Sequence, residues 1–332
     1  MKVLVSGGCG YIGSHTAVEL FQAGYEVVII DNFVNSKAEV LDKIEAITGK
    51  RPIFYEGDAR DIELLERVFS EHQIHAAIDF AAYKAVGESV EKPLMYYQNN
   101  LNCLLNLCEV MQRHDCKNLV FSSSATVYGE PDSVPISEDF PLSTTNPYGS
   151  TKLFAEMILQ DLYKADPTWS IAILRYFNPI GAHESGLIGE DPNGIPNNLM
   201  PYICKVANQE LPYLHIFGDD YQTHDGTGVR DYIHVVDLAK GHIAALAKIS
   251  DQHIIDVYNL GTGQGYSVLD MVNTYMSVNH IDVPYQIEAR RSGDIPECYA
   301  DTSKAEKELN WKAEKNLTEM CRDSHRFATG SK

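Results

Sequence analysis

The sequence lacks long apolar runs, paired cysteine motifs and an excess of positive charge. No apolar run reaches the roughly 18 residues that span a bilayer as a helix, so we expect no transmembrane segment. The seven cysteines include no Cys-x-x-Cys pair and are odd in number, so we expect free thiols in a reducing compartment rather than a disulfide framework. With 27 Lys and Arg against 46 Asp and Glu, the net charge of −19 disfavours binding to nucleic acid or to an anionic membrane.

Metal-ligand spacing is also missing. Among the 12 histidines only His72 and His75 lie close together, with no cysteine near them, so we predict no metal site. The 332 residues are 44% hydrophobic and 22% charged, as in ordinary globular proteins, and suffice for about two domains. Because residues 2–6 predict a strand rather than a signal peptide, we expect a cytoplasmic protein.

The N-terminal half alternates strands with helices. Apolar, often β-branched runs predict strands over residues 2–6, 26–30, 52–55, 75–80, 118–122 and 170–176. Helical periodicity predicts helices over 11–23, 36–48, 61–71 and 96–113, the last with Leu101, Leu104, Leu105 and Cys108 facing the core. This alternation indicates an α/β protein with a Rossmann-type, doubly wound parallel sheet that is covered by helices on both faces.

A glycine-rich turn lies between the first strand and the first helix. Gly7 permits a tight turn, Gly10 lets the backbone approach a pyrophosphate, and Gly13 allows the helix to pack closely. The helix N-terminus then presents free N–H groups to the phosphates. Asp31 ends the second strand, where a carboxylate binds ribose hydroxyls and opposes a 2′-phosphate, so we predict NAD rather than NADP. A turn without a ligand is the alternative interpretation of the glycines.

The composition changes after about residue 178. Residues 178–200 and 208–230 are rich in Gly, Pro, Asn and Asp and are predicted as loops, followed by strands around Ile233 and over 257–260. We predict an NAD-binding domain over residues 1–177, to which residues 231–260 return. Residues 178–230 and 261–332 would form a smaller α/β domain that binds the substrate.

A serine, a tyrosine and a lysine complete the pattern. Tyr148 and Lys152 lie four residues apart and so share one face of a helix, and Ser124 ends the strand that begins at Asn118. A tyrosine base at neutral pH needs a pKa lowered by about 3, which corresponds to roughly 4 kcal/mol. A nearby ammonium and a cationic nicotinamide ring both favour the phenolate. Such a pair alone is typical of a helix surface, but downstream of the glycine turn it indicates hydride-transfer chemistry.

The glycine spacing resembles that of the extended short-chain dehydrogenases/reductases. Longer stretches resemble the UDP-glucose 4-epimerases, also called UDP-galactose 4-epimerases, at residues 7–15, 84–89, 122–129, 175–179, 194–202 and 226–234. The resemblance spans essentially the whole chain. It implies an enzyme in which hydride passes from sugar C4 to NAD, the 4-keto sugar turns over within the site, and hydride returns to its other face.

The resemblance also implies a role for each matching residue. Tyr148 would take the proton of the sugar 4-hydroxyl, Ser124 would relay it, and Lys152 would hold the nicotinamide ribose and lower the Tyr148 pKa. Implied cofactor contacts, besides those already named, are Tyr11, Ile12, Asn32, Asn35, Ser36, Asp58, Ala59, Phe80, Ala81, Lys84, Asn99, Ser122 and Phe177. Implied contacts of the UDP-sugar, besides Ser124 and Tyr148, are Thr126, Asn178, Asn198, Leu199, Phe217, Arg230, Arg291, Asp294 and Cys298. A homodimer through a four-helix contact is implied too, with helix 96–113 supplying one face.

Two residues depart from the pattern of the family. Asp79 stands where we expect His, and is either a tolerated polar residue below the cofactor or a change that alters NAD affinity. Cys298 stands where some relatives carry Tyr, and a small side chain in the sugar pocket would admit a 2-acetamido group. UDP-N-acetylglucosamine and UDP-N-acetylgalactosamine would then be further substrates, or alternatively the main pair. The other interpretation is that Cys298 only packs in the protein interior and has no effect on specificity.

Two other functions occur on this fold, and the sequence disfavours both. A sugar-nucleotide dehydratase of this fold places an Asp-Glu pair just after the position of Ser124, whereas Ala125, Thr126 and Val127 follow here. A non-catalytic sensor of NAD redox state typically loses the Tyr–Lys pair, which this chain retains. The variant Tyr148→Phe distinguishes an enzyme from a sensor, because it should abolish the turnover of an enzyme and leave a binding module unaffected.

Overall fold

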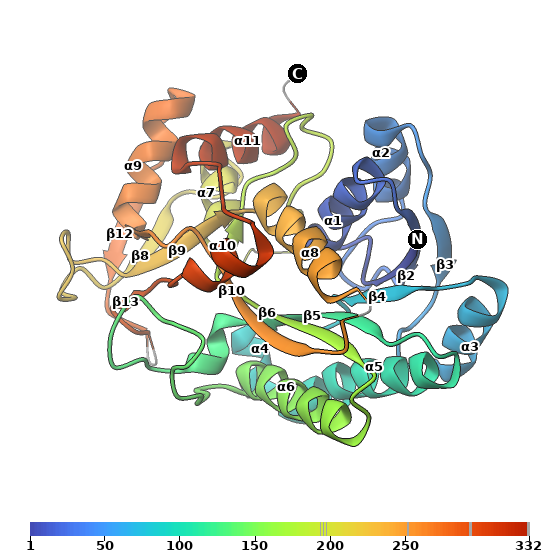
Figure 1. Cartoon of the computed structure of the whole chain (residues 1–332). Coiled ribbons are helices and arrows are strands. Elements are labelled where there is room, and N and C mark those ends of the chain that lie inside the picture. Colours follow the sequence, from blue (N-terminus) through green and yellow to red (C-terminus); the bar gives the residue numbers. More distant parts are fainter. Residues whose placement is uncertain (193, 195, 197, 251, 292–293, 331–332) are drawn as a thin grey trace.

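A seven-stranded parallel sheet forms the centre of the protein, in the order β10-β6-β5-β4-β1-β2-β3. The computed structural model describes residues 1–192, 194, 196, 198–250, 252–291 and 294–330 (Figure 1). The strands of this sheet are β1 (Lys2–Ser6), β2 (Glu26–Asp31), β3 (Ile53–Glu56), β4 (Ala76–Asp79), β5 (Asn118–Ser124), β6 (Ser170–Tyr176) and β10 (Ile255–Leu260). The strand order reverses between β1 and β4, and ligands of doubly wound sheets bind at this point, beyond the carboxyl ends of the strands.

Helices cover both faces of the sheet (Figure 1). On one face lie α1 (Tyr11–Gln22), α2 (Glu39–Thr48) and α8 (Val235–Ile249), and on the other α3 (Ile62–Glu71), α5 (Pro93–Arg113) and α6 (Pro147–Ala165). The short helix α4 (Val86–Glu91) packs beside α5 and α6, and the 3₁₀ helix η1 (Ala125–Tyr128) follows β5. Because both faces are covered, inner strands such as β2 are continuous apolar runs. The predicted Rossmann-type fold is confirmed.

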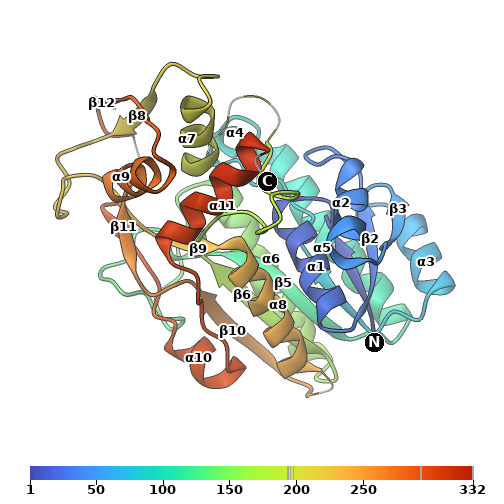
Figure 2. The ribbon, with the colours of Figure 1, turned by 90° about the horizontal axis from the view of Figure 1, so that it is seen from above.

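A smaller part of the molecule lies on the side away from α2 and α3 (Figure 2). Its main sheet contains β7 (Asn178–Ile180), β9 (Val229–His234), β11 (Gly265–Ser267) and β13 (Glu297–Cys298), and β8 (Leu214–Phe217) pairs with β12 (Tyr285–Glu288). Helices α7 (Leu199–Ala207), α9 (Val268–Asn279) and α11 (Leu317–Thr329) share its apolar core, whereas α10 (Ser303–Leu309) packs on α8 and β10. Of the segment predicted to return to the first sheet, α8 and β10 do so, while β9 belongs to the smaller sheet.

The predicted elements of the first 177 residues are present, with ends within three residues of the observed ones. The helix predicted from residue 36 begins at Glu39, since Ser36 instead donates a hydrogen bond from its hydroxyl to Asp31 (2.7 Å). Leu105 was predicted to face the core, and this was wrong: its side chain is 43% exposed.

The segment predicted as loops after residue 178 contains more regular structure than expected. It includes α7 and β8, and Pro201 lies in the first turn of α7, where proline is tolerated because that N–H needs no helical acceptor. In the part of the chain that the structure describes, no helix combines the length and apolar character needed to cross a membrane.

Candidate active site

A cleft of about 390 Å³ opens at the carboxyl ends of the central strands. All the predicted cofactor contacts line it, and so do five of the predicted substrate contacts, Ser124, Thr126, Tyr148, Asn178 and Asn198. The structure therefore brings together, around one cavity, residues that lie as far apart in the sequence as the glycine turn and Asn198.

A second cavity of about 450 Å³ adjoins the cleft and shares Asn178 and Asn198 with it. It is lined by the predicted substrate contacts Leu199, Phe217, Arg230, Arg291 and Asp294. The guanidinium of Arg291 lies over the Phe217 ring (4.8 Å to its centroid) and donates to Asp294 (Nε to Oδ2, 2.9 Å). Two arginines on one cavity suit a diphosphate, since a guanidinium can bind phosphate oxygens through two parallel hydrogen bonds.

Cys298 is the one predicted substrate contact that neither cavity includes among its lining residues. It packs against the apolar cluster that contains Tyr128, Ile136, Phe177 and Ala300. Its backbone on β13 pairs with that of Arg230 on β9, and Arg230 lines the second cavity, so the strand pairing holds Cys298 next to this cavity.

The glycine turn has the geometry that a dinucleotide requires. Gly7 adopts a left-handed conformation (φ +69°) and donates its N–H to the Ile30 carbonyl (2.8 Å). A Cβ atom on Gly13 would lie 2.3 Å from the Gly7 carbonyl oxygen, so no larger residue fits there without a shift of the backbone. Gly10 is the N-cap of α1 and offers no capping side chain, which leaves this helix start open to an anion.

The carboxylate of Asp31 is held firmly at the end of β2. Its Oδ2 accepts the Cys9 N–H (2.9 Å), and its Oδ1 accepts the Phe33 N–H (2.9 Å) and the Ser36 hydroxyl (2.7 Å). These donors fix the carboxylate at the wall of the cleft, where a carboxylate can accept hydrogen bonds from the hydroxyls of a ribose. Together with the turn that only glycine fits, this anchored acid suits NAD and not a 2′-phosphorylated dinucleotide.

The start of α6 positions the tyrosine and the lysine. The side chain of Asn146 caps the helix by accepting the Gly149 N–H (2.8 Å), and Pro147 occupies the first helical position, where its fixed φ suits the helix. Tyr148 and Lys152 follow one turn apart and both line the cleft.

Lys152 and Ser124 each have hydrogen-bond partners at the end of β5. The Lys152 ammonium is buried, donates to the Ser122 carbonyl (2.6 Å) and lies 5.0 Å from the centroid of the Phe121 ring. The Ser124 hydroxyl accepts the N–H (3.2 Å) and the hydroxyl (3.0 Å) of Thr126. The three predicted catalytic side chains thus converge where β5 and α6 meet the cleft.

The electrostatics of this group differ from the expectation. Burial raises the pKa of Tyr148, and its hydrogen bond with Ser124 acts in the opposite direction. Burial lowers the pKa of Lys152 to about 8, against which the charge of Asp79 raises it. We expected Lys152 to lower the Tyr148 pKa, but its ammonium is bonded to a backbone carbonyl, and these side chains alone do not produce that lowering.

Asp79 lies directly beneath the cleft without lining it. It ends β4, is 4% exposed, accepts a hydrogen bond from the Ser6 hydroxyl and a longer one from the Ala81 N–H (3.3 Å). Burial raises its pKa, whereas Ser6 and the charge of Lys152 lower it. The departure from His therefore places a buried acid close to the catalytic lysine.

Several residues of the cleft were not predicted. Tyr176, at the end of β6, lines it and its hydroxyl is hydrogen-bonded to Ser122. Glu190 pairs with Lys84 (2.9 Å), and Asp191 forms an ion pair with Lys37. No local pattern indicates these pairs, because their members are separated by more than 100 residues of sequence.

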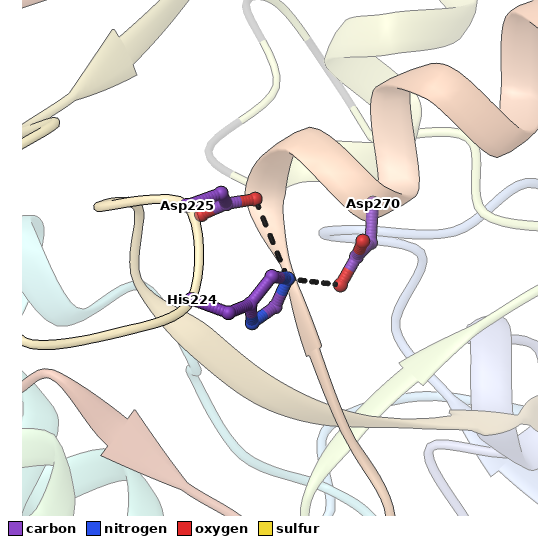
Figure 3. Close-up of side chains that lie close together, drawn as sticks. All are labelled: His224, Asp225 and Asp270. Carbon is purple, nitrogen blue, oxygen red and sulfur yellow. Dashed lines mark ion pairs between the residues drawn. The ribbon is translucent and has the colours of Figure 1, made fainter.

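Among the residues that the structure describes, one group of side chains has metal-ligand proximity, and it lies outside both cavities (Figure 3). His224 Nε2 is 3.1 Å from Asp270 and 3.6 Å from Asp225. Both carboxylates also bond Ser267, the N-cap of α9: Asp225 accepts its hydroxyl and Asp270 accepts its N–H (3.0 Å). These hydrogen bonds stabilise the N-terminus of α9, which explains the grouping of the three side chains, and we assign no metal to it.

Comparison with known proteins agrees with this geometry. The family model described as GDP-mannose 4,6 dehydratase matches residues 4–324. A "UDP-glucose 4-epimerase" of Bacillus subtilis is 58% identical over 331 residues, covering 100% of this chain and 98% of the relative, and one of Dictyostelium discoideum is 56% identical over 98% and 95%.

Solved structures agree equally well. The UDP-glucose 4-epimerase of Bifidobacterium longum, determined in complex with NAD+ and UDP, is 55% identical, with a TM-score of 0.96 over 100% of this chain and 99% of that one. The enzyme of Stenotrophomonas maltophila, with bound NAD and formylated UDP-arabinopyranose, is 50% identical, with a TM-score of 0.98 over 99% and 98%. A cleft built for a dinucleotide, the Ser–Tyr–Lys group at its centre and these matches along the whole length lead to one conclusion: the chain belongs to the UDP-glucose 4-epimerase family of the extended short-chain dehydrogenases/reductases.

Proposed function

We propose that this chain is an NAD-dependent enzyme that interconverts UDP-glucose and UDP-galactose by inverting C4 of the sugar. One observation carries the proposal: the glycine turn and Asp31 share a cleft with Ser124, Tyr148 and Lys152, and a cavity with two arginines adjoins it. The relatives described above bear this activity in their names, and both solved structures contain the same dinucleotide.

Bound NAD supplies the chemistry that the side chains lack, because its nicotinamide accepts a hydride from sugar C4 and returns it. Tyr148 takes the proton of the 4-hydroxyl as the hydride leaves and gives it back when the hydride returns to the other face of the 4-keto sugar. Ser124 hydrogen-bonds Tyr148 and so orients the phenol toward the substrate. Lys152 would hold the nicotinamide ribose, and the cationic nicotinamide ring would supply the positive charge that favours the phenolate.

The adjoining cavity holds the nucleotide part of the substrate. Arg230 and Arg291 supply two guanidinium groups for the diphosphate in a protein whose net charge is otherwise strongly negative. Phe217 offers an aromatic face, and Asp294 an acceptor for ribose hydroxyls. Anchoring the nucleotide there leaves the sugar at the shared boundary, near Asn178 and Asn198, where it reaches the catalytic group.

We infer that the glucose and galactose nucleotides are the main pair. Acceptance of the N-acetylated pair, expected from the small side chain of Cys298, stays a prediction; the curated relatives described above are named for the glucose substrate. An assay of UDP-N-acetylglucosamine against UDP-glucose measures the preference directly.

A coupled assay of the purified protein with UDP-galactose tests the proposed function, with UDP-glucose formation as the readout and no added NAD. Turnover under these conditions shows both epimerisation and retained cofactor. We expect Tyr148→Phe to reduce turnover by about 10²- to 10⁴-fold, the usual contribution of a general base, while NAD remains bound. If the unaltered protein with added NAD forms no product from either sugar pair, the proposal is wrong.

We also propose that the protein is a homodimer joined through α5 and α6. These helices pack on each other and carry exposed apolar side chains, among them Leu94 (74% exposed), Leu105, Phe154 and Met157 (52%). Tyr97 on α5 stacks on Phe154 of α6 (6.0 Å between centroids), so the aromatic surface spans both helices. Light scattering should give twice the chain mass of 37.1 kDa, and Leu94→Glu with Met157→Glu should give the monomer.

A reducing compartment such as the cytoplasm fits the cysteines. All seven are free thiols, and six are buried. Disulfides are therefore not part of this fold, and unfolding measured with and without a reductant should give the same midpoint.

A further inference from the structure

Glu190 lines the cofactor cleft and contacts Asn198, which the cleft shares with the second cavity. Its Oε1 accepts a hydrogen bond from the Lys84 ammonium (2.9 Å) and another from the side-chain amide of Asn198 (2.6 Å). Lys84 lines only the cofactor cleft, whereas Asn198 lines both the cleft and the cavity with the two arginines. A single carboxylate oxygen thus holds one side chain from the connection after β4 and another from the N-cap of α7.

The rest of the carboxylate is unusual for a buried acid. The Glu190 side chain is 8% exposed, and its Oε2 is buried with no hydrogen-bond partner among the described residues. A buried carboxylate oxygen without a donor is unfavourable, and such groups in native proteins call for a functional explanation. The negative charge of Glu190 also contributes to raising the pKa values of Tyr11 and Cys204.

The backbone around Glu190 is anchored from behind. Gly189 packs so closely on α11 that a Cβ atom there would lie 2.4 Å from the Phe327 ring. Its backbone also forms an isolated antiparallel β-bridge with Ala182. On the same segment, Asp191 makes its ion pair with Lys37, which comes from the connection after β2. Glu190 is therefore fixed between its two partners, and Asp191 offers a matched control.

We propose that Glu190 is a positioning residue that couples the cofactor cleft to the UDP-sugar cavity, so that a nucleotide bound in the cavity slows the release of NAD. This inference rests on the proposed function for the identity of the two ligands. A ligand that orders Asn198 also orders the carboxylate, and the carboxylate holds Lys84 in place at the cofactor. The first ligand to bind thereby orders side chains that the second ligand also needs. The second ligand then loses less conformational entropy on binding, so the two ligands bind with positive coupling.

The test is the release of labelled NAD from the purified holoenzyme, chased with unlabelled NAD, with and without saturating UDP. We expect UDP to slow release about fivefold or more, the lower end of the range for coupled sites, in the unaltered protein. Glu190→Gln keeps the size and an acceptor for Asn198 but removes the ion pair, and we expect the UDP effect to fall below about twofold. In Asp191→Asn the full UDP effect should remain, whatever the basal release rate.

Three results would overturn the inference: no effect of UDP in the unaltered protein, an undiminished effect in Glu190→Gln, or an equal loss in Asp191→Asn. Thermal unfolding of each variant, with the apoprotein as reference, shows that a lost effect does not come from a lost fold. Because the readout is NAD release rather than turnover, a protein that binds both ligands without epimerising them would refute the proposed function and still test the coupling.

Discussion

The buried ion pair between Arg175 and Glu156 offers the sharpest stability test of this structure. The guanidinium contacts the carboxylate at 2.6 Å, and the two side chains are 3% and 0% exposed. Glu156 also accepts the Ser123 hydroxyl (2.5 Å), and Arg175 donates to the Tyr128 hydroxyl (3.1 Å) and to the Glu138 carbonyl (3.1 Å). The network therefore joins α6, β5, β6 and η1 directly behind the catalytic residues.

The perturbation is Glu156→Gln, which keeps the volume and leaves the buried guanidinium without its counter-charge. Breaking a buried pair in this way costs about 3–5 kcal/mol. At about 2.1 cal/mol/K per residue, the unfolding entropy of 332 residues is roughly 0.7 kcal/mol/K, so Tm should fall by ~4–7 °C. Circular dichroism during a thermal scan of the apoprotein measures this shift.

Two controls sharpen the result. Glu39→Gln breaks the exposed pair with Lys43 (2.8 Å, one helical turn apart), which contributes at most about 0.5 kcal/mol, and should lower Tm by less than ~1 °C. Replacing both members of the buried pair by Leu and Met should recover much of the loss, because no uncompensated charge remains. A Tm for Glu156→Gln within 1 °C of the unaltered protein would refute the argument that this pair is buried and essential.

The remaining predictions concern the cofactor and pH. Gly13→Ala should cost about 1–3 kcal/mol through the clash of its Cβ with the backbone of the turn, and the purified variant should contain less NAD by absorbance; an unchanged NAD content would contradict the role of the turn. Asp79→Asn should lower the Lys152 pKa below about 8, because the charge that raises it is lost, so the alkaline limb of the kcat profile should move to lower pH, and Asp79→Glu should restore it. His15 and His242 are buried with pKa values lowered to about 3 and about 4, so below pH 6.5 the unfolded chain binds protons that the folded chain does not. The free energy of unfolding should then be independent of these groups above pH 6.5 and fall by about 1.4 kcal/mol per pH unit for each below it. Urea unfolding at pH 7.5, 6.5 and 5.5 measures how the free energy of unfolding depends on pH. Below pH 6.5, His242→Gln should take up one proton fewer on unfolding, so this dependence should be weaker; an equal dependence in both proteins would show that His242 does not contribute.

The sequence predicted what depends on local chemistry. Strands, helices and the glycine turn follow from periodicity and from backbone freedom at positions such as Gly7, so the Rossmann-type sheet was predicted almost to the residue. The position of Asp31 at a strand end was predicted for the same reason, since the residues of that strand indicate where it ends. Which face of a helix is buried is harder to predict, as Leu105 shows. The 21-residue helix α5 has apolar residues on more than one face, and only the packing of neighbouring elements decides which of them is buried.

Features created by tertiary packing had no local signal. Glu190 acquires its partners from segments 106 residues before it and 8 residues after it, and nothing in its own segment indicates either. Cys298 was assigned to the sugar pocket by resemblance alone, and its strand partner Arg230 comes from a segment 68 residues earlier, which no local pattern indicates. The hydrogen bond from Lys152 to the Ser122 carbonyl also had no local signal, because a spacing of four residues does not say which acceptor the lysine reaches.

The late arrival of β10 in the central sheet has a consequence for how the chain is made. β10 pairs with β6 along six residues, from Ile255 to Leu260, yet about 80 residues are synthesised between the two strands. As the chain emerges from the ribosome, β6 is an open edge, and the face that α8 covers stays exposed, until the first elements of the smaller part, from β7 to β9, have been translated. A fragment ending near residue 177 should therefore aggregate, and the two halves of this protein are one folding unit in spite of their separate sheets.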